Sequence, residues 1–461
     1  MRKLVFAAVL LIPAACTVGP RHQVPETPLP ERFDQAMSET TAEPAGSKLW
    51  TGFGSSELDG LIARALEANT TIAQAAARLA ETRALSGLSV YYWFPTITAG
   101  ADGQRSLISG DDPFAPPGGL QIDTYRAGFD ASWEIDLFGG LRNESRSVDR
   151  RTEANAALLA DAQLSIVAET AQAWFAMIGA RERLALRRRQ LANLKDNVAI
   201  LTARFNAGYS SGLDLAQAEA DMRAVAATVP QAEADLVREE QRLAVLTAWP
   251  IETLRSTISP TASIPELPVL VAAGTPEEWL KRRPDVRAAE RELAASYSDV
   301  GDEIAEYFPK VTLLGAFGWT SQSRDQIGEP EAERWFYGPS ITWSFLDFGR
   351  IHQRVKASEA RRDGAIARYQ ESVLLALEET ENALAGFRAA NQSEAELRAG
   401  AAAATEAARL ARKRYAVGAG EYLAVLVSER TQIELADQHV QAETRRATTL
   451  AALYKALAGD P

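Results

Sequence analysis

Apolar and polar residues alternate with a period of two in four segments of the chain. The pattern is clearest from Tyr125 to Leu137, where the odd positions read Tyr, Ala, Phe, Ala, Trp, Ile, Leu and the even positions Arg, Gly, Asp, Ser, Glu, Asp. Val311 to Trp319 and Tyr337 to Phe345 show the same pattern, and Thr96 to Ser106 shows it most weakly. Because successive side chains of a strand point to opposite faces, these segments predict four strands with one apolar and one polar face each.

Two stretches carry the three-and-four spacing of apolar residues that indicates a helix. One runs from Gly140 to Phe205, and the other runs from Gly349 to Tyr415. At 1.5 Å per residue each helix would be about 100 Å long. An ordinary bundle helix is the alternative interpretation, but this length favours a coiled-coil-like rod.

Glycine-rich turns follow both long helices, at Gly208 to Gly212 and at Gly418 to Gly420. Glycine permits a tight reversal of the chain. Return helices are therefore predicted from Leu213 to Leu246 and from Leu423 to Leu457, so that each turn joins two antiparallel helices. A further helix is predicted to begin at Ser56 and to end before Pro95.

The chain repeats itself at a nearly constant offset. Phe94-Pro95 recurs as Phe308-Pro309. A second set recurs with a slightly shorter offset, namely Trp133, Phe138-Gly139, Phe205, Gly208 and Leu213 as Trp343, Phe348-Gly349, Tyr415, Gly418 and Leu423. The two copies lie about half of the chain's length apart, which indicates a duplicated half with pseudo-twofold character. The predicted parts are a signal peptide (1–15), an extended arm (16–55), a first repeat (56–248), an irregular proline-rich linker (249–275) and a second repeat (276–461).

The N-terminus has the order of a secretory signal. Arg2-Lys3 precedes an apolar run from Leu4 to Ile12, and small residues lead to Cys16, the only cysteine among the 461 residues. The spacing resembles a lipoprotein box, so we expect Cys16 to carry a lipid anchor; an ordinary cleaved signal with an idle cysteine is the alternative. The net charge of -12 argues against a nucleic-acid partner.

Export changes the interpretation of the four strands. A sheet with one solvated face is the simpler interpretation of alternating strands, but strands of about ten residues with aromatic residues near their ends are typical of outer-membrane barrels. Four strands cannot close a barrel, because single-chain barrels begin at about eight. Several copies of the chain must therefore pool their strands.

A set of short motifs resembles the outer membrane factor family of TolC-like channels, and within it the lipoproteins of tripartite efflux systems, similar to nodulation protein T. The motifs are Cys16 to Pro20, the Trp50 and Phe53 pair, Arg283-Pro284-Asp285-Val286, Trp133 to Gly139, and Arg414-Tyr415 with Gly418 and Tyr422-Leu423. The resemblance implies a homotrimer whose twelve strands form one outer-membrane β-barrel, continued by a long periplasmic α-helical barrel. It implies a passive exit channel, with a periplasmic adaptor, an inner-membrane proton-driven pump and outer-membrane lipid as partners. The outlet of a type I protein secretion system is the alternative function.

The same resemblance places the glycine turns, Gly208 with Gly212 and Gly418 with Gly420, at periplasmic tips that contact the adaptor. In α-helical register Leu426, Ile433 and Val440 form the apolar seam of the last helix. We hypothesise a periplasmic aperture formed by five residues near this seam: Leu426, Val427, Glu429, Arg430 and Glu219. Packing or pairing of these side chains between helices is the alternative.

No set of residues resembles a catalytic or cofactor site. The histidines, His22, His352 and His439, are far apart in the sequence, and Gly418-Ala419-Gly420 lacks the context of a phosphate loop. We therefore expect no enzymatic activity and no cofactor. A structural coiled-coil lipoprotein would keep the long helices but has no use for strands with opposed apolar and polar faces.

Overall fold

The computed structural model describes residues 17–35, 53–114, 116–268 and 275–457, and the chain divides into two compact units. Unit 1 comprises residues 1–26, 78–156 and 288–370, and unit 2 comprises residues 27–77, 157–287 and 371–461. Each unit takes segments from both predicted repeats. The repeats are therefore interleaved in space and do not fold as separate domains.

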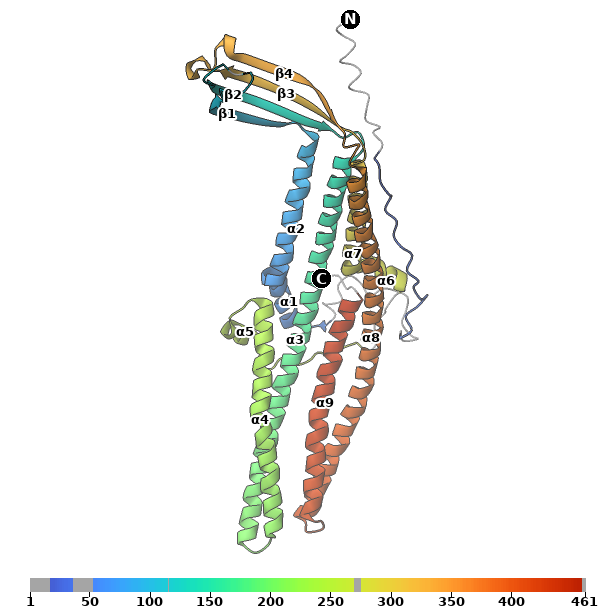
Figure 1. The fold of residues 1–461 in the computed structure, drawn as a ribbon. Helices are drawn as coiled ribbons and strands as arrows, with labels where there is room; N and C mark the ends of the chain where they lie inside the picture. The colour runs from blue at the N-terminus through green and yellow to red at the C-terminus, as the bar shows by residue number, and fades with distance from the viewer. Residues whose placement is uncertain (1–16, 36–52, 115, 269–274, 458–461) are drawn as a thin grey trace. The chain divides into compact units, whose positions relative to one another are not determined.

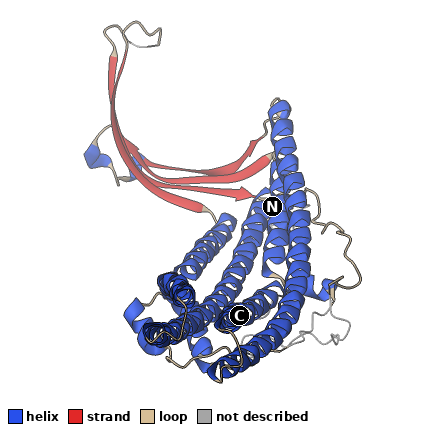
Figure 2. Cartoon of the chain, turned by 90° about the horizontal axis from the view of Figure 1, so that it is seen from below, coloured by secondary structure: helices blue, strands red, loops and turns tan. Residues whose placement is uncertain are grey.

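Unit 1 contains a four-stranded antiparallel sheet in the order β1-β2-β3-β4 (Figure 1), whose strands are red in Figure 2. The strands are β1 (Thr96–Ile108), β2 (Leu120–Ile135), β3 (Lys310–Ser321) and β4 (Glu333–Thr342). The prediction of four strands is confirmed, but β2 begins earlier than predicted and β4 ends before Trp343. These bounds coincide with the ends of the neighbouring strands, since Leu120 pairs with Ile108 at the end of β1 and Thr342 pairs with Lys310 at the start of β3.

The helices confirm the predicted rods and their return helices (Figure 1). Their bounds are α1 (Ser56–Ala68), α2 (Thr70–Ser89), α3 (Gly140–Asn206), α4 (Gly212–Thr247), α5 (Ile251–Thr257), α6 (Pro276–Arg282), α7 (Pro284–Ala305), α8 (Phe348–Ala416) and α9 (Tyr422–Ala456). Short 3-10 turns occur at Val90–Trp93, Arg324–Gln326 and Pro330–Ala332. The predicted linker is less irregular than expected, because α5 lies within it.

The single helix predicted from Ser56 to before Pro95 is wrong, because Asn69 separates α1 from α2. Asn69 has extended backbone angles, φ -66° and ψ 130°. Its side-chain oxygen accepts a hydrogen bond from the backbone N–H of Thr71 at 2.8 Å, as a helix N-cap does. The apolar stripe continues across this break, so periodicity alone did not reveal it.

Residues 17–35 form no helix or strand, yet they make specific contacts within each unit. In unit 1 the N–H of Val18 donates to the carbonyl of Phe138 at 3.1 Å, and the amide of Asn143 donates to the carbonyl of Val18 at 2.9 Å. In unit 2 the ring of Phe33 packs edge-on against Trp279, with 5.6 Å between centroids. The arm is thus part of the fold of both units.

Two tryptophans make equivalent bonds in the two halves of unit 1. The indole N–H of Trp133 donates to the carbonyl of Trp93 at 3.1 Å, and that of Trp343 donates to the carbonyl of Tyr307 at 3.0 Å. Each bond joins a residue near the C-terminal end of one strand to the residue three positions before the start of the partner strand. The duplication seen in the sequence therefore extends to individual hydrogen bonds.

Strands β2 and β3 approach closely where two glycines face each other. Gly128 pairs with Gly318. A Cβ on Gly128 would lie 2.5 Å from the carbonyl oxygen of Phe317 and 2.8 Å from the Cα of Gly318. The interior of the sheet has no room for a side chain at this point.

We expect Gly128→Ala to force β2 and β3 apart and to lower the free energy of unfolding by about 1–3 kcal/mol, as overpacking does. Thermal unfolding of the purified protein, followed by circular dichroism, measures the change. Gly338→Ala in β4 is the matched control, because a Cβ there meets nothing within 4 Å. Equal melting temperatures for the two variants would contradict the prediction.

Asp302, near the end of α7, is the most perturbed carboxyl group of unit 1. Burial raises the pKa of Asp302 to about 6, and the nearby carboxylates of Glu144, Glu303 and Glu306 add to the effect. The ammonium group of Lys310 opposes it but does not cancel it. The native state therefore keeps the proton on Asp302 at pH values where an unfolded chain, with an ordinary pKa of 3.8, has lost it.

This difference destabilises the native state as pH rises, because between about pH 4 and pH 6 the native state binds more protons than the unfolded state. We expect Asp302→Asn to remove that slope and to stabilise the protein at pH 7 by about 1–2 kcal/mol after allowance for solvent screening. Melting temperatures measured from pH 4 to pH 7.5 check this. Asp111→Asn, on an exposed loop, serves as the control, and a parent-like pH slope for Asp302→Asn would sink the prediction.

Candidate functional site

The tip between α3 and α4 is a tight turn built around Gly208. The N–H of Tyr209 donates to the carbonyl of Arg204 at 2.8 Å, and the N–H of Gly208 donates to the carbonyl of Phe205 at 2.9 Å. This pair of bonds is the Schellman motif, in which a residue with positive φ ends a helix. Gly208 has φ 79°, a conformation that other residues rarely adopt.

The tip between α8 and α9 has the same motif at the equivalent place in the second repeat. The N–H of Ala419 donates to the carbonyl of Arg414 at 2.9 Å, and that of Gly418 donates to the carbonyl of Tyr415 at 3.0 Å. Gly418 has φ 75°. Gly212 and Gly420, the other predicted tip residues, do not have positive φ, so the reversal depends on Gly208 and Gly418.

The two tips differ in how the return helix begins. Helix α4 has a capping box, in which the hydroxyl of Ser211 accepts from the N–H of Asp214 at 3.1 Å and the carboxylate of Asp214 accepts from the N–H of Ser211 at 3.3 Å. At the start of α9, Glu421 makes no such side-chain bond. The first turn of α9 is therefore less firmly closed than that of α4.

Leu426 and Val427 lie in different environments near the start of α9. Leu426 is 3% exposed and belongs to an apolar cluster with Leu201, Ala218, Tyr422 and Val425. Its placement fits the packing alternative, because the chain's own helices cover a side chain that was predicted to face an aperture. Val427 is 55% exposed, so of the two it is the one available to line an opening.

Glu429 and Arg430 both make ion pairs. The buried carboxylate of Glu429 accepts from Nε of Arg412 at 2.7 Å and from the amide of Asn197 at 3.2 Å. Nε of Arg430 lies 3.0 Å from both carboxylate oxygens of Asp221. Arg430 therefore links α9 to α4, whereas Glu429 joins α9 to both long helices.

Glu219 is exposed on α4, and no ion pair within the described residues places it with the four residues on α9. Cys16, the predicted lipid anchor, lies outside the described residues. The structure thus places Leu426, Glu429 and Arg430 in contact with neighbouring helices of the same chain, and it leaves Val427 and Glu219 on surfaces of the single chain.

A cavity of about 660 Å³ lies between α3, α4 and α9, beside these residues. Its lining includes Arg187, Asp221, Leu426, Glu429, Arg430, Ile433 and Asp437. The carboxylate of Asp437 is buried and pairs with Arg183 at 3.1 Å and with Arg187 at 2.9 Å. Asp437 and Asp221 were not among the residues predicted from the sequence. The spacing of seven between Arg430 and Asp437, which parallels the apolar seam, is the signal that could have revealed Asp437.

Within the described ranges, no group of three or more His, Cys, Asp and Glu side chains is arranged to hold a metal ion. No helix in the part of the chain that the structure describes combines the length and the apolar character needed to cross a membrane.

Comparison with known proteins identifies relatives along nearly the whole chain. The family model described as "Outer membrane efflux protein" matches residues 61–248 and 275–459. Outer membrane protein OprJ of Pseudomonas aeruginosa is 28% identical, with 100% of this chain and 97% of OprJ covered. Nodulation protein T of Rhizobium leguminosarum bv. viciae is 26% identical, with 93% and 87% covered.

Solved structures agree with the sequence comparison. The outer-membrane channel OprN has a TM-score of 0.89 and 34% identity, with 96% of this chain and 99% of that chain covered. The MtrE outer membrane channel of Neisseria gonorrhoeae, in its open state, has a TM-score of 0.84 and 28% identity, with 96% and 98% covered.

These findings confirm the fold and the function expected from the resemblance. The fold is that of the TolC-like trimeric channels, in which four strands from each chain contribute to a twelve-stranded outer-membrane barrel that continues as a periplasmic helical barrel. The protein is an outer-membrane efflux channel. With a family model matching both repeats and relatives matching almost end to end, the chain belongs to the outer membrane efflux protein family.

Proposed function

We propose that this channel is the lipid-anchored, passive exit duct of a tripartite efflux system. In this proposal a periplasmic adaptor binds the hairpin tips and an inner-membrane proton-driven pump supplies the energy. The family description names efflux, which favours this function over the outlet of a type I protein secretion system. The chain conducts and does not catalyse.

The observation that carries the proposal is the exposure of apolar side chains at both tips. Tyr209 is 84% exposed and Val417 is 77% exposed, and Leu213 and Leu423 beside them are also exposed. Exposed apolar residues that gather at one place mark a surface for a protein partner. The equivalent turns at Gly208 and Gly418 present two similar surfaces per chain, which suits an adaptor that binds repeatedly around a trimer.

The proposed lipid anchor depends on the extended arm at residues 16–55. Residues 1–15 would be removed as a signal peptide and Cys16 would be acylated in the outer membrane. The next residues already have a defined position in unit 1, where Val18 bonds to Phe138 and Asn143. An arm held in this way keeps a lipid on Cys16 tethered to unit 1. The repeats at 56–248 and 276–461, joined through 249–275, then build the barrel and the helical tunnel.

The aperture in this proposal depends on Val427 and on the charged residues beside it. The Arg430 to Asp221 pair holds α9 against α4, and Glu429 with Arg412 and Asn197 holds α9 against α3 and α8. Glu219, matched to Glu429 in the first repeat, adds an exposed negative charge. Opening requires an adaptor that binds the separated helices more tightly than the paired ones.

We expect Arg430→Ala to raise the single-channel conductance of the trimer in planar bilayers, because it removes the bond between α9 and α4. Val427→Ala should also raise conductance, by widening the opening. Arg238→Ala is the control, since Arg238 pairs only with acids on its own helix in the described chain. If neither Arg430→Ala nor Val427→Ala changes conductance, these residues are not part of the aperture.

Leu426→Ala should instead lower the free energy of unfolding by about 2–5 kcal/mol, as truncation of a buried leucine does.

We expect Leu213→Asp at the first tip to abolish efflux in cells while leaving the trimer and its conductance intact, because a charge on the apolar surface opposes docking of the adaptor. Export measured in a strain complemented with each variant checks this. Val237→Asp, on an exposed part of α4 away from the tip, is the control. Full efflux with Leu213→Asp would exclude this surface from adaptor binding.

A further inference from the structure

The outward face of the barrel strands β1, β2 and β3 carries charge only near one end. The outward positions are the odd-numbered ones, because the apolar face of an outer-membrane barrel meets lipid. They hold apolar residues or glycine from Ile97 to Gly103 in β1, from Tyr125 to Ile135 in β2 and from Val311 to Trp319 in β3. Arg105 and Asp123 are the charged residues of this face, and they pair directly across β1 and β2.

The height of this pair matches the cell-surface edge of the lipid. Asp123 lies ten residues before Trp133 in β2, and Trp133 is close to the end of the strand that leads into a helix. At about 3.4 Å per residue and a strand tilt of about 40°, ten residues rise about 25 Å along the membrane normal, which is the height of the apolar band of such barrels. The helical barrel of this fold is periplasmic, so Asp123 lies at the boundary that faces the cell exterior.

Arg105 is bound to Asp123 but keeps free donors. Its Nε lies 2.6 Å from Oδ1 of Asp123, and its Nη2 lies 2.7 Å from Oδ2. A guanidinium group has five N–H bonds, so this fork uses two of them and leaves three. The side chain of Arg105 is 68% exposed. Its remaining donors can therefore bind a second anion outside the sheet.

Arg324 adds a second guanidinium group on the same face. The next outward pair along the strands is Gly103 with Tyr125, and a Cβ on Gly103 would lie 3.0 Å from a ring carbon of Tyr125. The ring therefore covers the bare backbone at Gly103. The guanidinium carbon of Arg324 lies 5.1 Å from the centre of this ring, which is a cation–π contact. Arg324 is thus held over the outward face, next to the pair of Arg105 and Asp123.

The charges of this group do not balance. Arg105 and Arg324 bring two positive charges to the single carboxylate of Asp123. The carboxylate of Asp325, next to Arg324 in the sequence, accepts a hydrogen bond from the hydroxyl of Ser323. In the part of the chain that the structure describes, no ion pair joins Arg324 to an acidic residue. One positive charge at this edge therefore has no counterion within the chain.

A phosphate group has the chemistry that fits two arginines, because the planar fork of arginine binds phosphate oxygens bidentately. The surroundings are apolar, since Leu107 on the same face is 73% exposed and the outward positions below are apolar or glycine. We propose that Arg105 and Arg324 bind the phosphate group of an outer-leaflet lipid, whose acyl chains lie along the apolar face below. This site is independent of the proposed function, because it lies outside the conducting lumen.

The test measures binding of lipid A, a phosphorylated glycolipid, to the purified detergent-solubilised trimer by native mass spectrometry. We expect the parent protein to bind lipid A and not the same lipid after enzymatic removal of its phosphates. Arg324→Gln should weaken binding about tenfold, because it removes a charged donor to the phosphate. Arg324→Lys keeps the charge without the fork and should weaken binding less.

Arg334→Gln is the matched control. Arg334 is also exposed and pairs with Gly318, but its even-numbered position places it on the lumen face. This variant should therefore bind lipid A as the parent does. Parent-like binding by Arg324→Gln, an equal loss with Arg334→Gln, or equal binding of the dephosphorylated lipid would overturn the site.

Inorganic phosphate separates a lipid site from a site for the free anion. Displacement of lipid A by an equal concentration of inorganic phosphate would overturn the lipid as ligand. If Arg324→Gln does not assemble as a trimer, the double variant Arg105→Gln with Asp123→Asn takes its place with the same outcomes, because it removes one arginine without leaving an unpaired carboxylate. These measurements involve neither the adaptor nor efflux, so their failure is distinct from failure of the proposed function.

Discussion

The fold depends on the fact that the four-stranded sheet has two open edges. β1 and β4 each have one neighbour in the described sheet, so the chain itself leaves a row of N–H and C=O groups without partners along both outer strands. Each unpaired group costs several kcal/mol in a bilayer. Closing the ring with three copies brings the edge of β4 in one chain to the edge of β1 in the next, which pairs both rows. The backbone therefore requires other copies of the chain to close the sheet, and the trimer meets this requirement.

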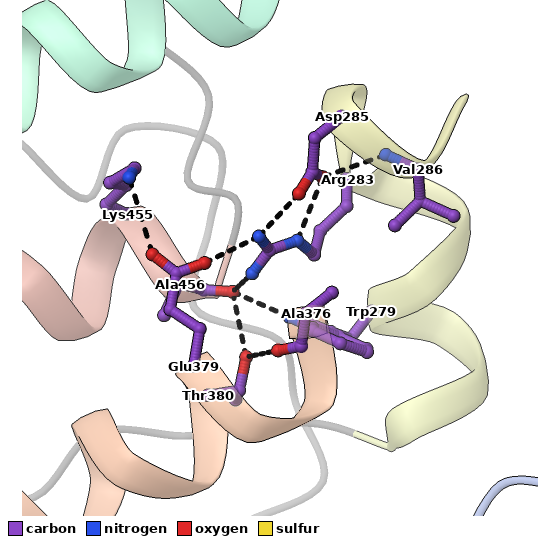
Figure 3. Close-up of polar contacts among 9 residues, drawn as sticks. All are labelled: Trp279, Arg283, Asp285, Val286, Ala376, Glu379, Thr380, Lys455 and Ala456. Atoms are coloured by element: carbon purple, nitrogen blue, oxygen red, sulfur yellow. Dashed lines mark hydrogen bonds and ion pairs between the residues drawn. The ribbon is translucent and has the colours of Figure 1, made fainter. Parts of the chain in front are cut away.

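The two repeats form equivalent hydrogen bonds at equivalent positions, but the side chains at some of these positions differ in charge. Trp133 and Trp343 make the same bond in the two halves, and Gly208 and Gly418 end their helices with the same motif. Asn69 and Arg283 occupy the same position, in the register of the repeated Phe-Pro pairs, but differ in charge, and Figure 3 shows the polar contacts of Arg283. The backbone plan is thus symmetric, whereas the ionic contacts are not.

The sequence was sufficient to predict the elements whose signal is local. The strand alternation, the long apolar rows and the glycine turns each depend on neighbouring residues, and the structure confirms them. The break at Asn69 was missed because a capping asparagine interrupts the backbone without interrupting the apolar stripe. For Leu426 the sequence left both packing and an aperture open, because a seam residue and an aperture residue look alike in sequence. The Arg430 to Asp221 pair joins residues 209 positions apart, and single-sequence spacing holds no information on that contact.

The buried ion pairs of Asp437 with Arg183 and Arg187 in unit 2 are not explained by their contribution to stability alone. Desolvation offsets most of the attraction in a buried pair, so such pairs are weak contributors to folding energy. The apolar seam at Leu426, Ile433 and Val440, however, has a heptad period and would tolerate a slip of one heptad, about 10 Å. After such a slip Asp437 would face Ala176 and Ala180, or Gln190 and Leu194, in place of Arg183 and Arg187. An unpaired buried carboxylate is costly, so we infer that Asp437 selects a single register for α9 against α3.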